Sequence, residues 1–286
     1  MSARPYNGAI SLALTLLMPF SNIFGGATFV ALSLRMSRLI FIKQISIALL
    51  GLSLIGLVIN ISIDELLISA LMTWLPALLL VILIKKTHSL IFSVQLLAVF
   101  SVLFLILFFW FIEQPVLFWN EVLMNVSDVL NQGGLVEQAR LLTESITNIA
   151  QQMTIVVIAM TWSIYSVILI LGCAIYRKSI NDENIFGNFT DLNFGKFLAI
   201  MTAISSLFLF IFDVDWLNNL AYLCFSFFWL QGLSFLHWLH QKRIIPSMGL
   251  ILTYVMLPFF NILLIMLLAI VGYTDAWFNY RNRIKN

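Results

Sequence analysis

Charged residues are scarce in this chain. Lys, Arg, Asp and Glu together make up 10% of its 286 residues, whereas they make up about a quarter of a typical soluble protein. This composition excludes an ordinary soluble domain and indicates an integral membrane protein. The net charge of +2 is too small to indicate a nucleic-acid partner. Both cysteines, Cys173 and Cys224, lie inside apolar runs without metal-ligand spacing, so we interpret them as small buried hydrophobic residues.

Catalytic signatures are also missing from the sequence. It contains no Gly-x-Ser-x-Gly, no His-Glu-x-x-His and no phosphate-binding Gly-x-x-x-x-Gly-Lys-Ser/Thr motif. The apolar runs hold almost no ionisable side chain, although intramembrane enzymes and ion carriers usually place such groups at mid-membrane depth. We therefore expect no enzymatic activity and no bound cofactor or metal.

Long apolar runs are what the chain does contain. From Ser89 to Ile112 no charged residue occurs, and roughly 20 apolar residues in a helix match a hydrocarbon core about 30 Å thick. We predict an all-α, polytopic transmembrane bundle with about nine apolar helices, forming a single integral membrane domain over residues 1–286. The expected helices lie at about 8–20, 25–37, 45–61, 66–84, 89–112, 153–176, 197–212, 217–239 and 244–271. Pro258 divides the last run, so nine and ten membrane passes both stay open.

Charges mark the ends of these runs. Cations follow alternate runs and acids follow the others, as the positive-inside rule requires. We predict a bacterial inner (cytoplasmic) membrane protein with a cytoplasmic N-terminus and without a cleaved signal peptide. The side of the C-terminus stays open. The expected inner clusters are Arg35, Arg38 and Lys43, then Lys85-Lys86, Arg177-Lys178 and Lys242-Arg243; the expected outer ones are Asp64-Glu65 and Asp213 with Asp215; the C-terminal cations are Arg281, Arg283 and Lys285.

An acidic segment at about 113–151 differs from the rest of the chain. It has Arg140 as its sole cation, and Gly133-Gly134 separates two stretches with apolar residues at helical spacing. This pattern predicts an extramembrane helical hairpin on the outer side, in which Arg140 pairs with Glu137 and Glu144. The hairpin is either a solvated loop lying on the membrane domain or a substrate lid or partner-binding element.

Neutral polar side chains within the apolar runs are candidates for solute binding. Such groups commonly form hydrogen bonds between helices; alternatively, some of them converge on a small polar ligand. The candidates are Asn60, Gln95, Ser163, Tyr165, Gln231 and Asn261.

Two further patterns allow contrasting interpretations. His237 and His240 would share one helix face beside Trp238, which indicates an interfacial basic cluster or, alternatively, part of a metal or proton site. Ala9 and Ala13 have the spacing that lets another helix approach closely, either within the chain or from a partner subunit.

The closing segment Gly272-Tyr273-Thr274-Asp275-Ala276-Trp277-Phe278-Asn279-Tyr280-Arg281 resembles the C-terminal signature of the YybS-like family of bacterial membrane proteins, and so does Gly232–His237. Asn279 departs from the second acidic residue of that pattern. Read physically, Thr274 or Asp275 would cap a short helix that places Trp277 at the lipid headgroups and lets Arg281 reach phosphates, with Gly272 at the start of this interfacial signature. The resemblance implies a membrane protein of unknown function, distantly similar to the substrate-binding S components of energy-coupling-factor transporters. In those proteins small residues of the first helix contact a coupling subunit, a role that Ala9 and Ala13 match in spacing.

These observations lead to two functional hypotheses. The first is a membrane subunit that binds a solute or lipid-like molecule within its helices and serves transport with separate energising partners. The second is a non-catalytic scaffold or assembly factor of the cell envelope that docks through the 113–151 hairpin. Membrane lipids are expected partners in both.

Overall fold

The computed structural model describes residues 6–60, 62–182, 185–209, 211–212, 214–257, 259 and 261–284. Every regular element in these ranges is a helix, which confirms the predicted all-α fold. Asp213, Pro258, Lys285 and the side chain of Asn261 lie outside the described residues. The run 244–271 that Pro258 was expected to divide forms two helices, Ser247–Met256 and Asn261–Phe278, and the choice between nine and ten membrane passes stays open.

Five of the described helices are long and apolar enough to cross a membrane. They are α3 (Arg38–Ile59), α4 (Ile63–Thr87), α5 (Leu90–Phe111), α7 (Val136–Ile180) and α9 (Asp215–Gln241). The prediction of about nine such helices is not confirmed. The other apolar runs form shorter helices: α1 (Asn7–Leu16), α2 (Ser21–Arg35), α8 (Gly195–Leu209), α10 (Ser247–Met256) and α11 (Asn261–Phe278). At 1.5 Å per residue, the ten residues of α1 extend about 15 Å, half of a hydrocarbon core.

The chain divides into two compact units, and each is described by itself. Unit 1 comprises Met1–Leu96 and Ser163–Asp191; unit 2 comprises Leu97–Trp162 and Leu192–Asn286. Two of the long helices, α5 and α7, contribute residues to both units. Whether the two units form the single membrane domain expected from the sequence stays a prediction.

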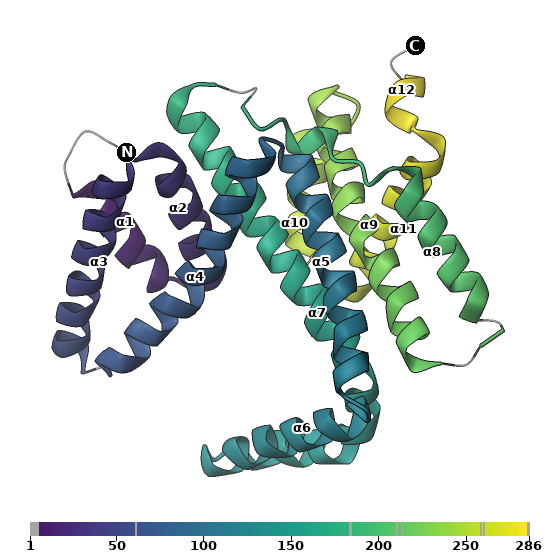
Figure 1. Cartoon of the computed structure of the whole chain (residues 1–286), viewed down its shortest axis with the longest axis horizontal. Helices are drawn as coiled ribbons and strands as arrows, with labels where there is room; N and C mark the ends of the chain where they lie inside the picture. The colour runs from purple at the N-terminus through teal and green to yellow at the C-terminus, as the bar shows by residue number, and fades with distance from the viewer. Residues whose placement is uncertain are drawn as a thin grey trace. The chain divides into compact units, whose positions relative to one another are not determined.

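Unit 1 is built on the packing of α1, α2, α3 and α4 (Figure 1). Phe29 of α2 lies at its centre, stacked on Trp74 of α4 with ring centroids 5.9 Å apart and edge-on to Phe41 of α3 at 4.9 Å. Gly172 of α7 lies against Val30, because a Cβ at this position would overlap the valine side chain. These contacts bring the last part of α7 beside α2.

Unit 2 is built around α9, which packs closely on α11 and also on α8 and α10. Two glycines make the α9–α11 contact possible. A Cβ at Gly232 would overlap the backbone carbonyl of Leu268, and a Cβ at Gly272 would overlap that of Phe228. The helices therefore touch backbone to backbone, as small residues permit between membrane helices.

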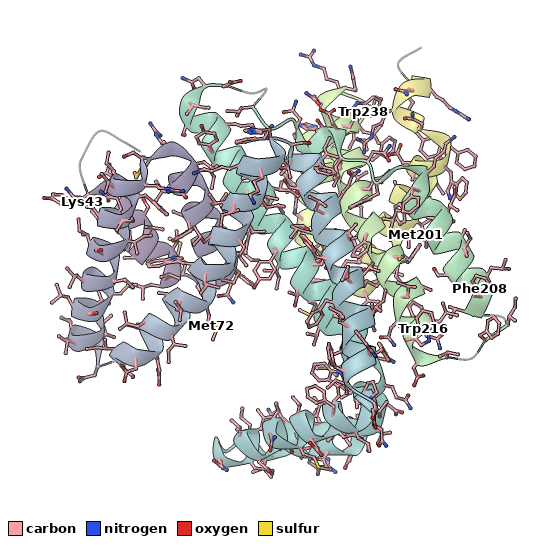
Figure 2. The ribbon with its side chains drawn as sticks, in the orientation of Figure 1. Lys43, Met72, Met201, Phe208, Trp216 and Trp238 are labelled. Carbon is pink, nitrogen blue, oxygen red and sulfur yellow. The ribbon has the colours of Figure 1, made fainter. Side chains whose placement is uncertain are left out.

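Large apolar side chains face outward on the long helices. On α3, Leu50, Leu54, Leu57 and Val58 are all more than 60% exposed, and a soluble monomer rarely exposes such a continuous apolar face. On α9, Trp216 and Trp238 lie near the two ends of the helix (Figure 2). They are 22 positions apart, or about 33 Å along a helix, but Trp216 faces outward at 45% exposure whereas Trp238 is buried at 5%.

The 113–151 segment forms the predicted helical hairpin. Its arms are α6 (Pro115–Gln132) and the beginning of α7, joined at Gly133-Gly134. Arg140 pairs with Glu137 at 2.7 Å and with Glu144 at 3.0 Å, as predicted. The hydrogen bond with Glu137 raises the pKa of Arg140 above its ordinary value. The sequence predicted a second arm separate from the following span, whereas α7 continues from Val136 to Ile180 without a break.

Candidate functional site

A network of buried polar side chains connects the helices of unit 2. Asp275 of α11 is fully buried, and its Oδ2 lies 3.4 Å from Nε of Arg281 in α12 (Tyr280–Ile284). Gln231 of α9 donates from Nε2 to the same Asp275 oxygen at 3.0 Å. The Oε1 atom of Gln231 accepts the backbone N–H of Phe194 at 2.8 Å. Arg281 also donates to Ser234 Oγ at 3.2 Å. The network thus ties α9, α11, α12 and the segment before α8 together.

This arrangement corrects the expected role of the C-terminal signature. Asp275 does not cap a helix but lies inside α11, and Arg281 is buried against Asp275 where the sequence predicted that it would reach lipid phosphates. The reason is Asn279, whose φ of 48° breaks the helix and starts α12 in a new direction. Asn adopts this left-handed conformation more readily than most residues. Gly272 belongs to the α9–α11 contact, while Trp277 is 37% exposed and stays available to an interface.

A first pocket lies where the hairpin meets α9, and we call it the hairpin pocket. It has a volume of about 400 Å³, within the ~300–1,000 Å³ range of small-molecule sites. Its lining comes from α6, α7 and α9 of unit 2: Val116, Gln151, Gln152, Ile155, Asp215, Asn218, Asn219 and Tyr222. Four of these eight side chains are amides, one is a carboxylate and none is a cation.

Asn219 is the most buried polar side chain of the hairpin pocket, at 8% exposure. Its Nδ2 donates to the backbone carbonyl of Asp215 at 2.8 Å. Its Oδ1 is buried and has no hydrogen-bond partner among the described residues. A buried acceptor without a donor costs about 1–3 kcal/mol; a ligand that donates to it would remove this cost.

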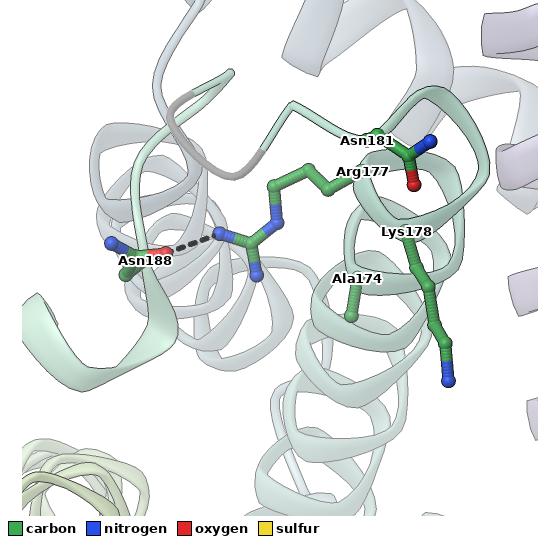
Figure 3. A pocket seen from close by; sticks show the side chains of 5 residues that line it. All are labelled: Ala174, Arg177, Lys178, Asn181 and Asn188. Carbon is green, nitrogen blue, oxygen red and sulfur yellow. Dashed lines mark hydrogen bonds between the residues drawn. The ribbon is translucent and has the colours of Figure 1, made fainter. Parts of the chain in front are cut away.

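A second pocket lies at the end of α7, and we call it the basic pocket. It has a volume of about 550 Å³ and is lined by Ala174, Arg177, Lys178, Asn181 and Asn188 of unit 1 (Figure 3). Arg177 donates from Nη1 to the carbonyl of Gly187 at 2.5 Å and to Oδ1 of Asn188 at 2.7 Å. These bonds hold the loop after α7 against the guanidinium group.

The six solute-binding candidates from the sequence do not line either pocket. Asn60 is exposed at the end of α3, where it adopts a left-handed φ of 57°. Gln95, Ser163 and Tyr165 are half-buried on α5 and α7, and Gln231 belongs to the buried network. The side chain of Asn261 is outside the described residues.

Sequence reasoning missed the residues of the hairpin pocket. A signal was present in the two amide pairs Gln151-Gln152 and Asn218-Asn219, which stand at the ends of apolar runs where the chain was expected to leave the membrane on the outer side. The candidates predicted from the sequence lie at mid-membrane positions instead. Polar groups at the membrane boundary carry little information alone, because such residues are common there.

The alanine pair and the histidine pair singled out in the sequence both make contacts within the chain. Ala9 and Ala13 are buried where α1 packs on α2 and α3, and the N–H of Ala9 donates to Oε1 of Gln44 at 2.7 Å. This burial favours packing within unit 1.

His237 Nε2 lies 2.8 Å from the Tyr254 hydroxyl, and His240 Nδ1 lies 3.0 Å from the carbonyl of Ile245. Within the described part of the chain no three His, Cys, Asp or Glu residues are grouped as metal ligands.

A protein-family model matches residues 9–276, and its description is "Predicted membrane protein (DUF2232)". The chain belongs to this family. No curated protein and no solved structure matches it. Family membership, the outward apolar faces and the five long helices agree on a multi-helix membrane protein. The YybS-like name and the likeness to transporter S components are not confirmed by these comparisons.

Proposed function

We propose that this DUF2232 protein binds a small polar solute in the hairpin pocket and serves as the solute-binding subunit of a transport system with separate energising partners. The supporting observation is the pocket itself, a space of about 400 Å³ lined by three helices, two of which, α7 and α9, contribute two side-chain amides each. It lies at the foot of the hairpin, where a helical lid would control access. The proposal involves no catalytic step.

The lining of the hairpin pocket favours a neutral or positively charged solute. Gln151, Gln152, Asn218 and Asn219 each offer both donors and acceptors, and Asp215 adds an acidic side chain. Since none of the eight described lining residues is Lys or Arg, an anionic solute would meet no compensating charge among them. The unpaired Oδ1 of Asn219 favours a solute with N–H or O–H donors. Val116, Ile155 and Tyr222 supply the apolar wall that small-molecule sites usually contain.

Native mass spectrometry of gently purified protein would test the proposal. We expect a retained non-lipid molecule in the wild type, and its loss in Gln152→Leu, which removes a lining amide. Asn131→Leu is the matched control, because Asn131 is an exposed amide at the tip of the same hairpin. Repeated preparations without any retained solute would refute the solute-binding role. Absence of a co-purifying ATPase would refute the transport coupling.

A second candidate function is supported by the surface of the hairpin. Met124, Val126, Val129 and Leu141 are all more than 40% exposed on its two arms, whereas the contact between the arms buries Ser127 and Ala139. An apolar surface of this kind fits a scaffold that docks another envelope protein. Photo-crosslinkers at Asp128 or Arg140 would then trap one specific protein. Crosslinks to lipid alone would argue against the scaffold.

A further inference from the structure

We propose that the basic pocket binds a phosphate-bearing anion, either the headgroup of an acidic phospholipid or a soluble phosphate ester. The inference is independent of the solute site, because the two pockets share no residue and belong to different units.

The spacing of the lining residues builds the pocket on one helix face. Ala174, Arg177, Lys178 and Asn181 stand at positions i, i+3, i+4 and i+7 of α7 and its end, which places them above one another on the same side. The small side chain of Ala174 leaves a hollow below the two cations. Figure 3 shows Arg177 reaching across to Asn188 and Lys178 extending along the other side of Ala174.

The hydrogen bonds of Arg177 give the pocket a fixed wall. Its bonds to Gly187 and Asn188 hold the guanidinium in place before any ligand arrives. A preorganised guanidinium loses little side-chain entropy on binding, and its planar set of N–H donors suits phosphate oxygens. Lys178 is exposed and supplies a mobile second cation, while the amide of Asn181 adds neutral donors.

The local charge also favours an anion. Among the residues that the structure describes, none of those lining the basic pocket carries a carboxylate. Further cations lie at the same end of unit 1, since Lys85 Nζ donates to the carbonyl of Ser33 near the end of α2, and Arg35 lines a small cleft with Ser179 of α7. The carboxyl end of α7 carries a partial charge of about −0.5, which is smaller than the two full positive charges of Arg177 and Lys178.

The volume and position of the basic pocket favour an organic phosphate over a bare inorganic ion. The pocket volume of about 550 Å³ falls in the ~300–1,000 Å³ range of organic ligands. The pocket also lies at the end of a membrane-length helix, where cations meet lipid phosphates. A phosphodiester headgroup with its acyl chains along α7 would satisfy both features, and a soluble phosphate ester would satisfy the first.

The test uses the full-length protein in detergent and follows its thermal unfolding during titration with three probes: phosphatidylglycerol, phosphatidylcholine and glycerol phosphate. We expect saturable stabilisation by phosphatidylglycerol but not by phosphatidylcholine, whose headgroup is zwitterionic. Lys178→Gln should weaken the apparent affinity roughly tenfold, the equivalent of one charge-assisted hydrogen bond. Lys43→Gln, which removes an exposed lysine from the first turns of α3 outside the pocket, should change it less than about twofold.

The probes distinguish the two sources of phosphate. Saturable binding of glycerol phosphate that is weakened by Lys178→Gln would identify a soluble ester, whereas a response to phosphatidylglycerol alone would identify a lipid headgroup. Equal responses to the acidic and zwitterionic lipids without binding of glycerol phosphate, or equal losses in the two lysine variants, would overturn the proposal. Lys178 has no described hydrogen bond within the protein, so the variant is expected to fold normally.

Discussion

Replacement of Arg281 by Met tests the energetic role of the buried network in unit 2. The substitution keeps an apolar side chain of similar length against Phe235, over whose ring the guanidinium now lies at 5.9 Å. It removes the charge that faces Asp275 at 3.4 Å. Asp275 is fully buried and cannot turn to solvent without moving α11. Arg281→Met therefore leaves a carboxylate with Gln231 as its described donor.

The expected loss follows from the geometry of the pair. At a separation of 3.4 Å and an effective dielectric constant of about 20, the attraction between two unit charges is about 5 kcal/mol. Breaking a buried pair by removing one partner typically costs about 3–5 kcal/mol of unfolding free energy. For a protein of this size, 1 kcal/mol corresponds to about 2–4 °C in the melting temperature. We therefore expect the variant to melt at least roughly 6 °C below the wild type.

A double variant separates the unpaired charge from the lost contact. Asp275→Asn combined with Arg281→Met removes both charges and keeps an oxygen that accepts from Nε2 of Gln231. We expect it to recover at least half of the loss in melting temperature, because a neutral pair is less costly to bury than a lone carboxylate. The assay is thermal unfolding of detergent-solubilised protein followed by tryptophan fluorescence. A double variant no more stable than Arg281→Met would refute the electrostatic explanation.

Three further perturbations follow from the packing. Gly232→Ala should lower the melting temperature sharply, because the new Cβ overlaps the backbone of α11. Gly51→Ala is the control and should raise the melting temperature slightly, because Gly51 faces open space on α3. Equal effects of the two substitutions would contradict the close contact between α9 and α11. Gln231→Leu should cost about 1–3 kcal/mol by leaving the Phe194 N–H without its acceptor, and hydrogen exchange at that amide should rise. Thr154→Val should weaken the contact between α6 and α7, because it removes the hydroxyl that accepts a hydrogen bond from Trp119 Nε1 at 2.8 Å. Spin labels on the two helices should then show a broader distance distribution, and an unchanged distribution would contradict this prediction.

The helices were predictable from the sequence because their signal is local. Apolar runs and terminal charges located α4, α5 and α9 within a few residues, whereas α3 begins at Arg38, seven residues before the predicted start at 45. The ion pairs of Arg140 followed from helical spacing alone. The lengths of the first two helices were less predictable. The sequence predicts two helices, at about 8–20 and 25–37, in the first apolar region, whereas α1 stops at Leu16 and α2 begins at Ser21. The break before α2 coincides with a left-handed Phe20, a backbone state that composition does not reveal.

The polar sites were less predictable because they depend on contacts between distant segments. Gln231 and Asp275 are 44 residues apart in the chain and meet through the close approach of α9 and α11. The sequence pattern predicts Arg281 at the lipid surface because it does not reveal the left-handed backbone of Asn279. That conformation changes the direction of the chain and brings Arg281 against Asp275. The hairpin pocket likewise combines three helices. Burial of a polar side chain is a property of the folded contacts and cannot be read from its neighbours in the chain.

The unbroken course of α7 limits how the hairpin can move. On the α6 side, the residues between Phe111 and Pro115 interrupt the helix and can act as a pivot. On the other side, Gln151, Gln152 and Ile155 are within the same rigid rod as the hairpin arm. A displacement of the arm must therefore tilt or rotate the walls of the pocket at the same time. Opening of the entrance and a change in the shape of the binding cavity would then be a single mechanical event.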